Sequence, residues 1–296
     1  MPNGVIILNK SEGLTSQSAV TRIKRLFSEP KAGHTGTLDP LATGVLPILL
    51  GRGVKASEYM LTADKHYTAT LTLGITTDTE DSSGNILSKC DTLPTEEAVL
   101  SAIAGFVGRY LQTPPMYSAL KIHGKKLCDL ARGGITVERE PREVFIHSIK
   151  AERLSERDYK LTVHSSKGTY IRTLCADIGK ALGVGGIMSA LRRDEASGFL
   201  LGESYTLEQL EAMSESEREA AVVSLSALFS RLGYTPVGFT GKAARLIRNG
   251  VTVPTDEKIS RGEKIAIYDS GELVAIGEGV AAGDGIAVKP TKQFII

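Results

Sequence analysis

Apolar and polar residues alternate most clearly along residues 67–73, Tyr-Thr-Ala-Thr-Leu-Thr-Leu. This alternation predicts a β-strand with one buried and one solvent-facing side. Apolar residues at helical spacing predict helices that begin near Ser16, Thr95 and Ile171, with a shorter helix over 125–131. Ser16 is the candidate cap of the first of these helices. Short apolar runs predict further strands at 5–8, 143–149 and 159–164.

The last third of the chain has a different pattern. Two helices are predicted within 206–232, the first of them rich in glutamate. Beyond Gly233 we expect a short basic helix over 242–250, followed by strands near 264–268, 273–276 and 286–289. The chain before residue 233 lacks the steady strand–helix alternation of a doubly wound sheet. The pattern therefore favours an α+β body followed by a small β-rich module.

Composition narrows the class of protein. The chain has 296 residues, of which 42% are apolar and 23% charged, and this excludes a disordered or collagen-like protein. A net charge of +1 argues against a protein that binds nucleic acid through bulk charge alone. Locally, basic residues exceed acidic ones by seven to four in 1–60, six to three in 119–142 and three to none in 242–250. The acids gather at 208–219, so we expect a basic track beside an acidic surface.

Targeting and metal-binding signals are weak. The first apolar run, at 5–8, is too short for a signal peptide, and no stretch approaches about 18 apolar residues. The three cysteines are widely spaced, and the five histidines include no His-x-x-x-His pair. These spacings argue against a disulfide framework, a thiolate zinc site and a helical metal site. We expect a cytoplasmic protein without a membrane segment and without a bound metal.

The densest candidate for chemistry is the segment 33–47, Gly-His-Thr-Gly-Thr-Leu-Asp-Pro-Leu-Ala-Thr-Gly-Val-Leu-Pro. Its glycines permit backbone conformations closed to other residues, and its prolines stiffen the chain. Asp39 is its single acid. The structural alternative is that Asp39 caps a helix beginning at Pro40, a favoured pair at helix starts. The segment is neither a phosphate-binding P-loop nor a dinucleotide fingerprint.

Two other residues stand in unusual positions. Arg172 falls in the first turn of the helix predicted from Ile171, with Thr169 as a candidate cap. The helix dipole disfavours a cation there by roughly 0.3–1 kcal/mol, so a carboxylate partner would account for it, and a solvated arginine is the alternative. Tyr67 opens the alternating strand on its apolar side, where a purely structural core tyrosine is the alternative.

Taken in order, these segments resemble the bacterial TruB family of pseudouridine synthases over essentially the full chain. The matching segments are Leu8-Asn9-Lys10 with Gly13-Leu14-Thr15-Ser16, residues 33–47, Lys65-His66-Tyr67, residues 115–121, residues 167–172 and Leu191-Arg192-Arg193. Residues from about 233 resemble the family's PUA domain, an RNA-binding module. Ser11 departs from the family pattern, which usually has proline after the lysine.

The resemblance implies an α+β fold with two domains. Residues 1–232 would form the catalytic domain, built on a mixed, mainly antiparallel sheet flanked by helices, and residues 233–296 a PUA-like RNA-binding domain. The implied enzyme isomerises uridine 55 in the T-arm stem-loop of tRNA to pseudouridine, breaking the N1–C1′ bond and rejoining the base through C5. No cofactor is required, because no hydride moves and no phosphate is consumed. The resemblance also implies a monomer with no obligatory protein partner.

The resemblance assigns roles residue by residue. Asp39 matches the catalytic aspartate, Arg172 the arginine that pairs with it, and Tyr67 the tyrosine that stacks on the flipped base and relays the C5 proton. Further residues match positions that line the target nucleotide or support the site: His34, Tyr170, Leu191 and Lys10. Lys55 and Lys121 are candidate phosphate contacts.

Three alternatives remain open on the sequence. A guide-dependent pseudouridine synthase acting on other RNA would need partners for its activity. A non-catalytic RNA-binding or tRNA-folding protein would lack the acid or its partner, yet Asp39, Tyr67 and Arg172 are all present. RNA folding could also accompany catalysis as a second activity. A glycosidase would require a second acid, for which Asp78 and Asp81 in the polar stretch 78–85 are candidates.

Overall fold

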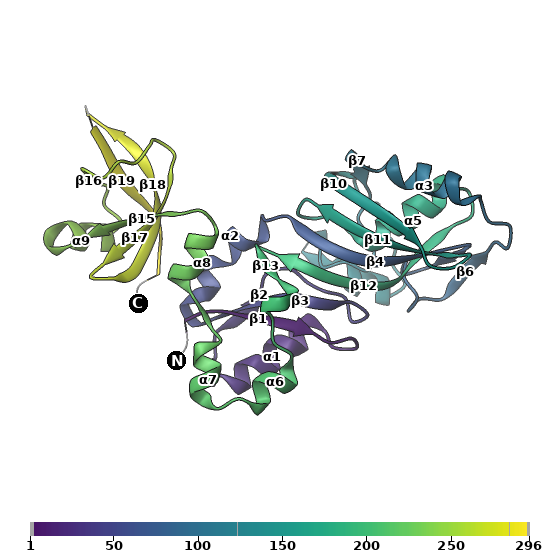
Figure 1. The fold of residues 1–296 in the computed structure, drawn as a ribbon, viewed down its shortest axis with the longest axis horizontal. Coiled ribbons are helices and arrows are strands. Elements are labelled where there is room, and N and C mark those ends of the chain that lie inside the picture. The colour runs from purple at the N-terminus through teal and green to yellow at the C-terminus, as the bar shows by residue number, and fades with distance from the viewer. Residues whose placement is uncertain (1–2, 123, 284, 295–296) are drawn as a thin grey trace.

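The computed structural model describes residues 3–122, 124–283 and 285–294. Two sheets dominate this part of the chain: a large one in the body of the protein and a smaller one near the C-terminus, joined through the helix α8 (Leu225–Arg231) (Figure 1). The described termini lie close together on the side of the body that faces the smaller sheet. The α+β class and the β-rich C-terminal part, both expected from the sequence, are confirmed.

The large sheet is mixed and mainly antiparallel. Its order along the main path is β14 (Val223–Ser224), β1 (Gly4–Lys10), β3 (Thr43–Leu50), β12 (Gly186–Ala196), β4 (Lys65–Leu73), β11 (Asp158–Ser165), β10 (Arg142–Arg153) and β7 (Gly108–Gln112). Two short strands, β2 (Ala32–His34) and β13 (Phe199–Leu200), pair with β3 and β12. Among these described pairings β12 with β3 is the parallel one. This contact joins the two halves of the sheet.

Helices cover the sheet and enclose its core. The helices α3 (Glu96–Ala104) and α5 (Ile171–Ala181) pack on the face of β4, β11 and β10 that carries the buried side chains. The helices α1 (Ser16–Leu26) and α6 (Leu207–Ala212) cover β1 and β3 with a second apolar cluster. The remaining helical segments are η1 (Gly51–Ala56), α2 (Ser57–Leu61), α4 (Leu127–Arg132), η2 (Leu201–Glu203) and α7 (Glu215–Ala220).

The C-terminal sheet has its own core. Its order is β15 (Thr235–Phe239), β17 (Lys264–Asp269), β18 (Glu272–Ala282), β19 (Gly285–Gln293) and β16 (Val253–Thr255), with the helix α9 (Gly241–Arg248) packed beside it. A third apolar cluster joins this sheet to the body through Phe229 and Phe294, whose rings meet edge to face at 5.2 Å. Ion pairs between Arg52 and Glu272 (3.2 Å) and between Lys292 and Glu58 (2.7 Å) lie along the same junction.

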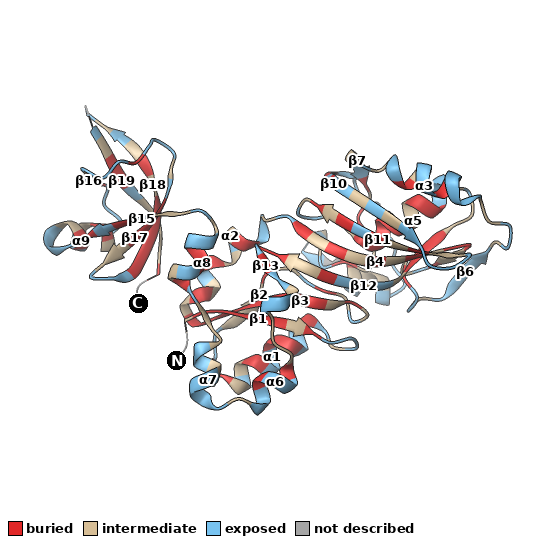
Figure 2. Cartoon of the chain, viewed as in Figure 1, coloured by how far each residue is buried: buried red, intermediate tan, exposed pale blue. Residues whose placement is uncertain are grey.

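Most helices and strands that were predicted from a regular spacing of apolar residues are confirmed. β4 alternates buried and half-buried residues through all its positions, a pattern visible along the strand in Figure 2. The strands near 5–8, 143–149 and 159–164 and the helices near Ser16, Thr95 and Ile171 are also present, and α9 carries the predicted basic residues. The short helix predicted over 125–131 begins at Leu127, because Lys125–Lys126 (β9) pairs with Lys121–Ile122 (β8).

Three expectations about local structure are wrong. Two helices were predicted within 206–232, whereas three are present, separated by Ser214 and Ser224, each of which caps the helix after it. Thr15, rather than Ser16, caps α1 by accepting a hydrogen bond from the Ser18 backbone. At α5 the cap position belongs to Tyr170, and Thr169 instead donates its hydroxyl to the Ser166 carbonyl (3.0 Å).

Candidate active site

Asp39 lies in a turn between β2 and β3, and the helix-cap interpretation of it is wrong. Residues 40 and 41 form a turn, in which the Ala42 N–H donates to the Asp39 carbonyl at 3.0 Å. The chain then enters β3 at Thr43. The Asp39 carboxylate is therefore not used to cap a helix, and its side chain remains 34% exposed.

Buried polar side chains hold this turn in place. The Ser16 hydroxyl donates to the Leu38 carbonyl (2.9 Å) and accepts from the Leu38 N–H (2.8 Å). The Lys10 ammonium donates to the carbonyls of Ser11 (2.9 Å), Leu14 (2.7 Å) and Pro40 (3.3 Å). These bonds flank Asp39 on both sides, so the backbone that carries the carboxylate is fixed by α1 and β1.

Gly44 makes the next close contact possible. Its φ is +98°, and a Cβ placed on it would lie 2.3 Å from the Arg193 carbonyl oxygen of β12. Any side chain here would separate β3 from β12 at their parallel contact. The glycine in this segment thus allows the two halves of the sheet to meet beside Asp39.

Arg172 is the centre of the site. Its side chain is 5% exposed, and its Nη2 lies 3.1 Å from Asp39 Oδ2. The same guanidinium donates to the Tyr117 carbonyl (2.9 Å), the Thr79 carbonyl (3.2 Å) and Asp81 Oδ2 (3.3 Å). The planar donor fork of arginine suits this arrangement, because one group binds four acceptors from three separate loops. The helix dipole does not favour this cation, and two carboxylates compensate for it.

Asp81 is the partner that the sequence did not single out for this role. Its side chain is 5% exposed, and its Oδ1 accepts from the Thr79 hydroxyl (2.7 Å), the Ser83 hydroxyl (2.5 Å) and the Ser83 N–H (3.0 Å). With Oδ2 on Arg172, both oxygens are engaged. Asp81 thereby fixes the orientation in which Arg172 meets Asp39.

Opposing influences set the protonation of Asp39. Burial raises its pKa above the usual value, Arg172 lowers it, Asp81 raises it and Lys10 lowers it. The carboxylate is thus less acidic than a free aspartate, although two cations favour its charged form. Partial desolvation of this kind makes a carboxylate more basic and more nucleophilic than it is in water.

Tyr67 lies across the sheet from Arg193. The two residues are register partners on β4 and β12, and both are buried, with exposures of 7% and 1%. Arg193 donates to the carbonyls of Val45 (2.7 Å) and Gly36 (3.2 Å). Burial lowers the pKa of Arg193, whereas Tyr67 favours the charged form of this arginine. Leu191 lies two residues before Arg193 on β12, opposite Ala69 of β4. It is half-buried and packs against two apolar clusters.

Tyr170 and His34 border the same region. The Gln112 side-chain amide fixes the Tyr170 backbone by accepting from its N–H (2.8 Å) and donating to its carbonyl (3.0 Å), and burial raises the pKa of the Tyr170 hydroxyl. His34 is half-buried at the end of β2, and its Nδ1 is buried without a hydrogen-bond partner in the described structure. Burial and the nearby Arg193 lower the pKa of His34, so the ring is neutral near pH 7.

The lysines differ in how accessible they are to a substrate. Lys10 is fully buried, and burial lowers its pKa to about 8. Its three N–H donors all meet backbone carbonyls, which favours a supporting role over direct contact with substrate. Burial likewise lowers the pKa of Lys65 to about 8. Lys55 donates to the Gln293 carbonyl (3.2 Å) at the junction with the C-terminal sheet, while Lys121 is exposed on β8.

The structure therefore brings four of the predicted residues around one turn: Asp39, Arg172, Lys10 and Tyr170. Tyr67 is linked to this turn through its register partner Arg193, which donates to the Gly36 carbonyl. Asp39 and Arg172 are in direct contact, and the electrostatic influence of Asp39 reaches Lys10 and Tyr170. Asp81 and Arg193 complete the charged network, although the sequence suggested Asp81 only as the second acid of a glycosidase and gave Arg193 no individual role. The signal for Arg193 was its place in the matched Leu-Arg-Arg segment, whereas nothing local to the stretch 78–85 distinguishes Asp81.

Comparisons with known proteins identify the family of the chain. Residues 24–171 match the model of the TruB family pseudouridylate synthase (N terminal domain), and residues 172–230 match that of the tRNA pseudouridylate synthase B C-terminal domain. The chain is 45% identical to "tRNA pseudouridine synthase B" of Dechloromonas aromatica (strain RCB), over 93% of this chain and 90% of that protein. It is 42% identical to the protein of the same name from Burkholderia mallei, over 91% and 90%. No helix among the described residues is long and apolar enough to cross a membrane.

Solved structures of lower sequence identity are also similar to the chain. The chain matches a protein in the crystal structure of a Cbf5-Nop10-Gar1 complex with a TM-score of 0.72 and 29% identity, over 99% of this chain and 85% of that one. It also matches a chain in the structure of an H/ACA RNP bound to a substrate RNA containing 2'-deoxyuridine, with a TM-score of 0.71 and 26% identity, over 99% and 85%. With both family models matched end to end from residue 24 to residue 230, the chain belongs to the TruB family of pseudouridylate synthases.

Proposed function

We propose that this chain converts uridine 55 in the T-arm loop of tRNA to pseudouridine, with Asp39 as the catalytic carboxylate. The observation that carries the proposal is the contact between Asp39 and the buried Arg172, which is itself held by Asp81 and two backbone carbonyls. This arrangement leaves one partly exposed carboxylate oriented by a fixed cation. The names of the curated relatives support tRNA as the substrate.

Access to the substrate requires base flipping. A stacked uridine cannot present C1′ and C5 to a carboxylate, so the nucleotide must leave the loop, which costs a few kcal/mol. Tyr67, Tyr170 and Leu191 supply aromatic and apolar surface that compensates for the lost stacking. His34, neutral and with an unpaired buried Nδ1, contributes a polar group at the same edge.

The chemistry conserves atoms and charge. The N1–C1′ bond breaks, the freed uracil rotates, C5 bonds to C1′, and a proton leaves C5 while N1 gains one. Asp39 serves this sequence either as a nucleophile at C1′ or by removing a ribose proton to give a glycal-like intermediate. Arg172 keeps Asp39 ionised and oriented in both routes. Tyr67 stacks on the base and relays the C5 proton.

The remaining parts of the chain have supporting roles in this proposal. Residues 1–232 form the catalytic domain, and residues 233–296 form a PUA-like domain that adds RNA affinity. In that domain Lys242 and Arg245 on α9 supply free positive charge for phosphates, whereas Arg248 is paired with Asp269 at 2.7 Å. The protein acts as a monomer without an obligatory protein partner.

The glycosidase alternative has little support from the geometry. Such an enzyme needs a second carboxyl group that is free to donate or accept a proton. Asp81 is the nearby acid, but both its oxygens are engaged and its side chain is 5% exposed. Asp78 is also occupied, since it accepts from the backbone and side chain of Asn85 at 2.8 and 3.0 Å.

The purified chain on an unmodified T-arm minihelix, with no guide RNA and no other protein, tests the proposal. We expect pseudouridine at position 55, detected by mass-spectrometric mapping, and none in a matched minihelix with cytidine at that position. Conversion that appears only with a guide RNA or partner proteins would favour the guide-dependent alternative. Faster tRNA folding without any conversion would favour a folding protein.

A further inference from the structure

A row of ionisable side chains crosses the large sheet on the face opposite Tyr67. His66 on β4 is the register partner of Glu195 on β12 and of His164 on β11. The His66 and His164 rings stack at 4.0 Å, and the His164 and His147 rings stack at 4.3 Å. Four neighbouring strands therefore each contribute one titratable side chain to a single line on this face.

A β-bulge places His147 at the end of the row. Ile146 pairs with Ser165 and Ser148 pairs with His164, so His147 has no register partner on β11. An extra residue of this kind bends the strand and redirects its side chain. The His147 ring lies on the exposed face of β10 together with Phe145 and stacks on His164 of the neighbouring strand.

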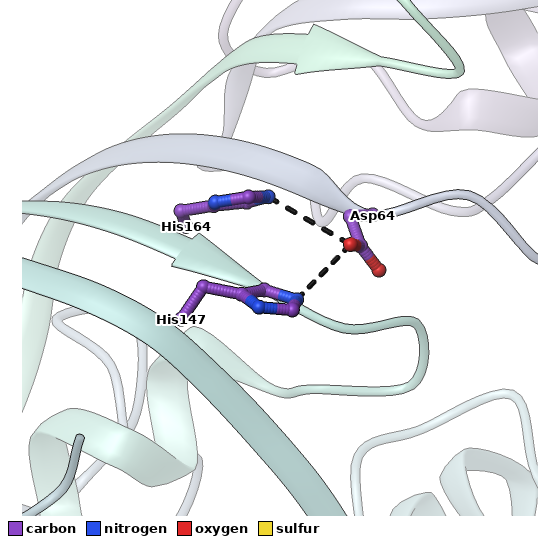
Figure 3. A group of neighbouring side chains, drawn as sticks. All are labelled: Asp64, His147 and His164. Carbon is purple, nitrogen blue, oxygen red and sulfur yellow. Dashed lines mark ion pairs between the residues drawn. The ribbon is translucent and has the colours of Figure 1, made fainter. Parts of the chain in front are cut away.

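Asp64, just before β4, closes the group. Its Oδ2 lies 3.0 Å from His147 Nε2 and 3.8 Å from His164 Nε2. Figure 3 shows the carboxylate beside the stacked rings, with both Nε2 atoms directed toward it. The three potential ligand atoms lie within 4.8 Å of one another.

We propose that Asp64, His147 and His164 form a binding site for a divalent transition-metal ion of the Zn²⁺ type. Two imidazole nitrogens and one carboxylate oxygen are a donor set that Zn²⁺ accepts, with water completing a tetrahedron. Ligands about 2.0–2.1 Å from a tetrahedral Zn²⁺ are separated by about 3.3 Å. The distances from Asp64 Oδ2 to the two nitrogens bracket that separation, and the stacked His147 and His164 rings must rotate apart for both nitrogens to point at one ion.

The neighbouring side chains restrain one of the ligand rings. The His164 ring lies between the rings of His66 and His147, with centroid distances of 4.0 and 4.3 Å. His66 stacks behind His164, and its Nε2 lies 3.5 Å from Glu195 Oε2, so this second pair fixes the plane of the ligand ring.

A bound ion would link three segments that are distant in sequence. Asp64 precedes β4, while His147 and His164 belong to β10 and β11. Because the ion binds the folded sheet and the three ligands are separated in the unfolded chain, it raises the stability of the protein by mass action. Two of the ligands come from β10 and β11, of which β11 is the strand paired with β4. This site does not depend on the proposed function.

Zinc titration of the full chain without a histidine tag tests the proposal. We expect one Zn²⁺ per chain by calorimetry and a rise in Tm on adding Zn²⁺. The double variant His147→Ala/His164→Ala weakens binding at least tenfold and removes the rise in Tm. Asp64→Ala weakens binding in the same direction and serves as the second variant if the double variant fails to fold. The matched control is Cys90→Ser/Cys128→Ser, which removes the two partly exposed thiols and leaves the affinity unchanged.

Cobalt identifies the ligands independently. Co²⁺ in this site gives a visible absorption band of tetrahedral intensity, which Zn²⁺ displaces and which is absent from folded His147→Ala/His164→Ala protein. Zinc affinity that is the same in this double variant and in the parent chain would overturn the proposal. Loss of binding in the cysteine control, or no binding by the parent chain, would overturn it as well.

Discussion

The two faces of β4 carry different chemistry on adjacent residues. On one face, Tyr67 meets a buried network in which Arg172, Arg193 and Asp81 are each at most 5% exposed. On the other face, His66 belongs to a row of partly exposed groups in which Asp64, His147 and His164 keep side-chain exposures of 30–46%. The difference is one of dielectric environment rather than of residue type, since both faces combine cations or imidazoles with carboxylates.

This difference determines what each face can do. Buried charges interact strongly and cannot rearrange, so the inner face suits the orientation of one carboxylate toward a reacting atom. Partly exposed imidazoles keep access to solvent and to ions, so the outer face suits reversible binding. We therefore expect turnover to depend on the inner face alone.

The largest effect is expected at Asp39. Asp39→Asn keeps the shape of the side chain but removes its basicity and nucleophilicity, so turnover of a T-arm minihelix falls by at least about 10⁴-fold. The matched control is Asp158→Asn, an aspartate on the outer face of β11 that accepts from Thr72 at 2.6 Å. Its turnover stays at the parent level in the same single-turnover assay, and equal losses in both variants would contradict the separation of the faces.

A smaller loss is expected at Arg172. Arg172→Lys replaces a planar fork with one ammonium that cannot reach Asp39, Asp81 and two carbonyls together, so turnover falls about 10²–10³-fold. The control is Arg132→Lys, because Arg132 pairs with Asp129 at 3.7 Å while both side chains are more than 60% exposed. That exposed pair contributes little, and a similar loss in the two lysine variants would argue against the network.

The acid limb of the pH profile reports on Asp81. Catalysis needs ionised Asp39, and burial and Asp81 raise the Asp39 pKa, so turnover is lost on acidification at a higher pH than a free aspartate would give. Asp81→Asn removes a negative charge and lowers the Asp39 pKa. We expect the acid limb to move to lower pH, while the plateau also falls because Arg172 loses an anchor.

The control for the pH profile lies in the same turn. Asp78→Asn alters an exposed carboxylate that contacts Asn85, and it leaves the acid limb where it is. An acid limb that moves to higher pH in Asp81→Asn would show that the Asp81 charge does not raise the Asp39 pKa.

Gly44 provides a test of the packing behind the inner face. Gly44→Ala puts a methyl group 2.3 Å from the Arg193 carbonyl oxygen at a positive φ, and we expect it to lower the free energy of unfolding by about 2–5 kcal/mol. Gly13→Ala has a positive φ as well but meets no atom within 4 Å, so about 1–2 kcal/mol is expected. Denaturant unfolding of both variants separates steric contact from backbone strain, and equal losses would contradict the close approach of β3 and β12.

The smallest effect is expected on the outer face away from the histidines. Thr162 is exposed on β11, opposite Thr68 on β4. Thr162→Val should change the free energy of unfolding by no more than about 0.5 kcal/mol and leave turnover unaltered. A marked loss of turnover in this variant would mean that the outer face takes part in catalysis.

Periodicity was sufficient to predict the regular elements of the fold. β4 alternates along its whole length, and α5 has a continuous apolar stripe, so both were predictable from local sequence. β12 was missed because two irregularities in its pairing with β4 interrupt the alternation. β3 was missed because seven of its eight residues are buried, and a strand enclosed on both sides has no polar face to reveal its period.

Only those site residues that lie in recognisable sequence motifs could be predicted. Asp39, Tyr67 and Arg172 were identified through segments that resemble a family, whereas the role of Asp81 arises from tertiary contacts between the turn at 78–85 and α5. The histidine group shows the same limit. His147 and His164 lie on the two strands of a hairpin and become neighbours only when β10 pairs with β11, so a search for ligand pairs on one helix could not find them.

The catalytic role of Asp39 can be tested by measuring single-turnover conversion and equilibrium binding of the same T-arm minihelix by the parent chain and by Asp39→Asn. We expect pseudouridine at position 55 only with the parent chain, while the two proteins bind the minihelix with affinities within a few-fold of each other. Undiminished conversion by Asp39→Asn would contradict the catalytic role of Asp39 at the centre of the Arg172 network.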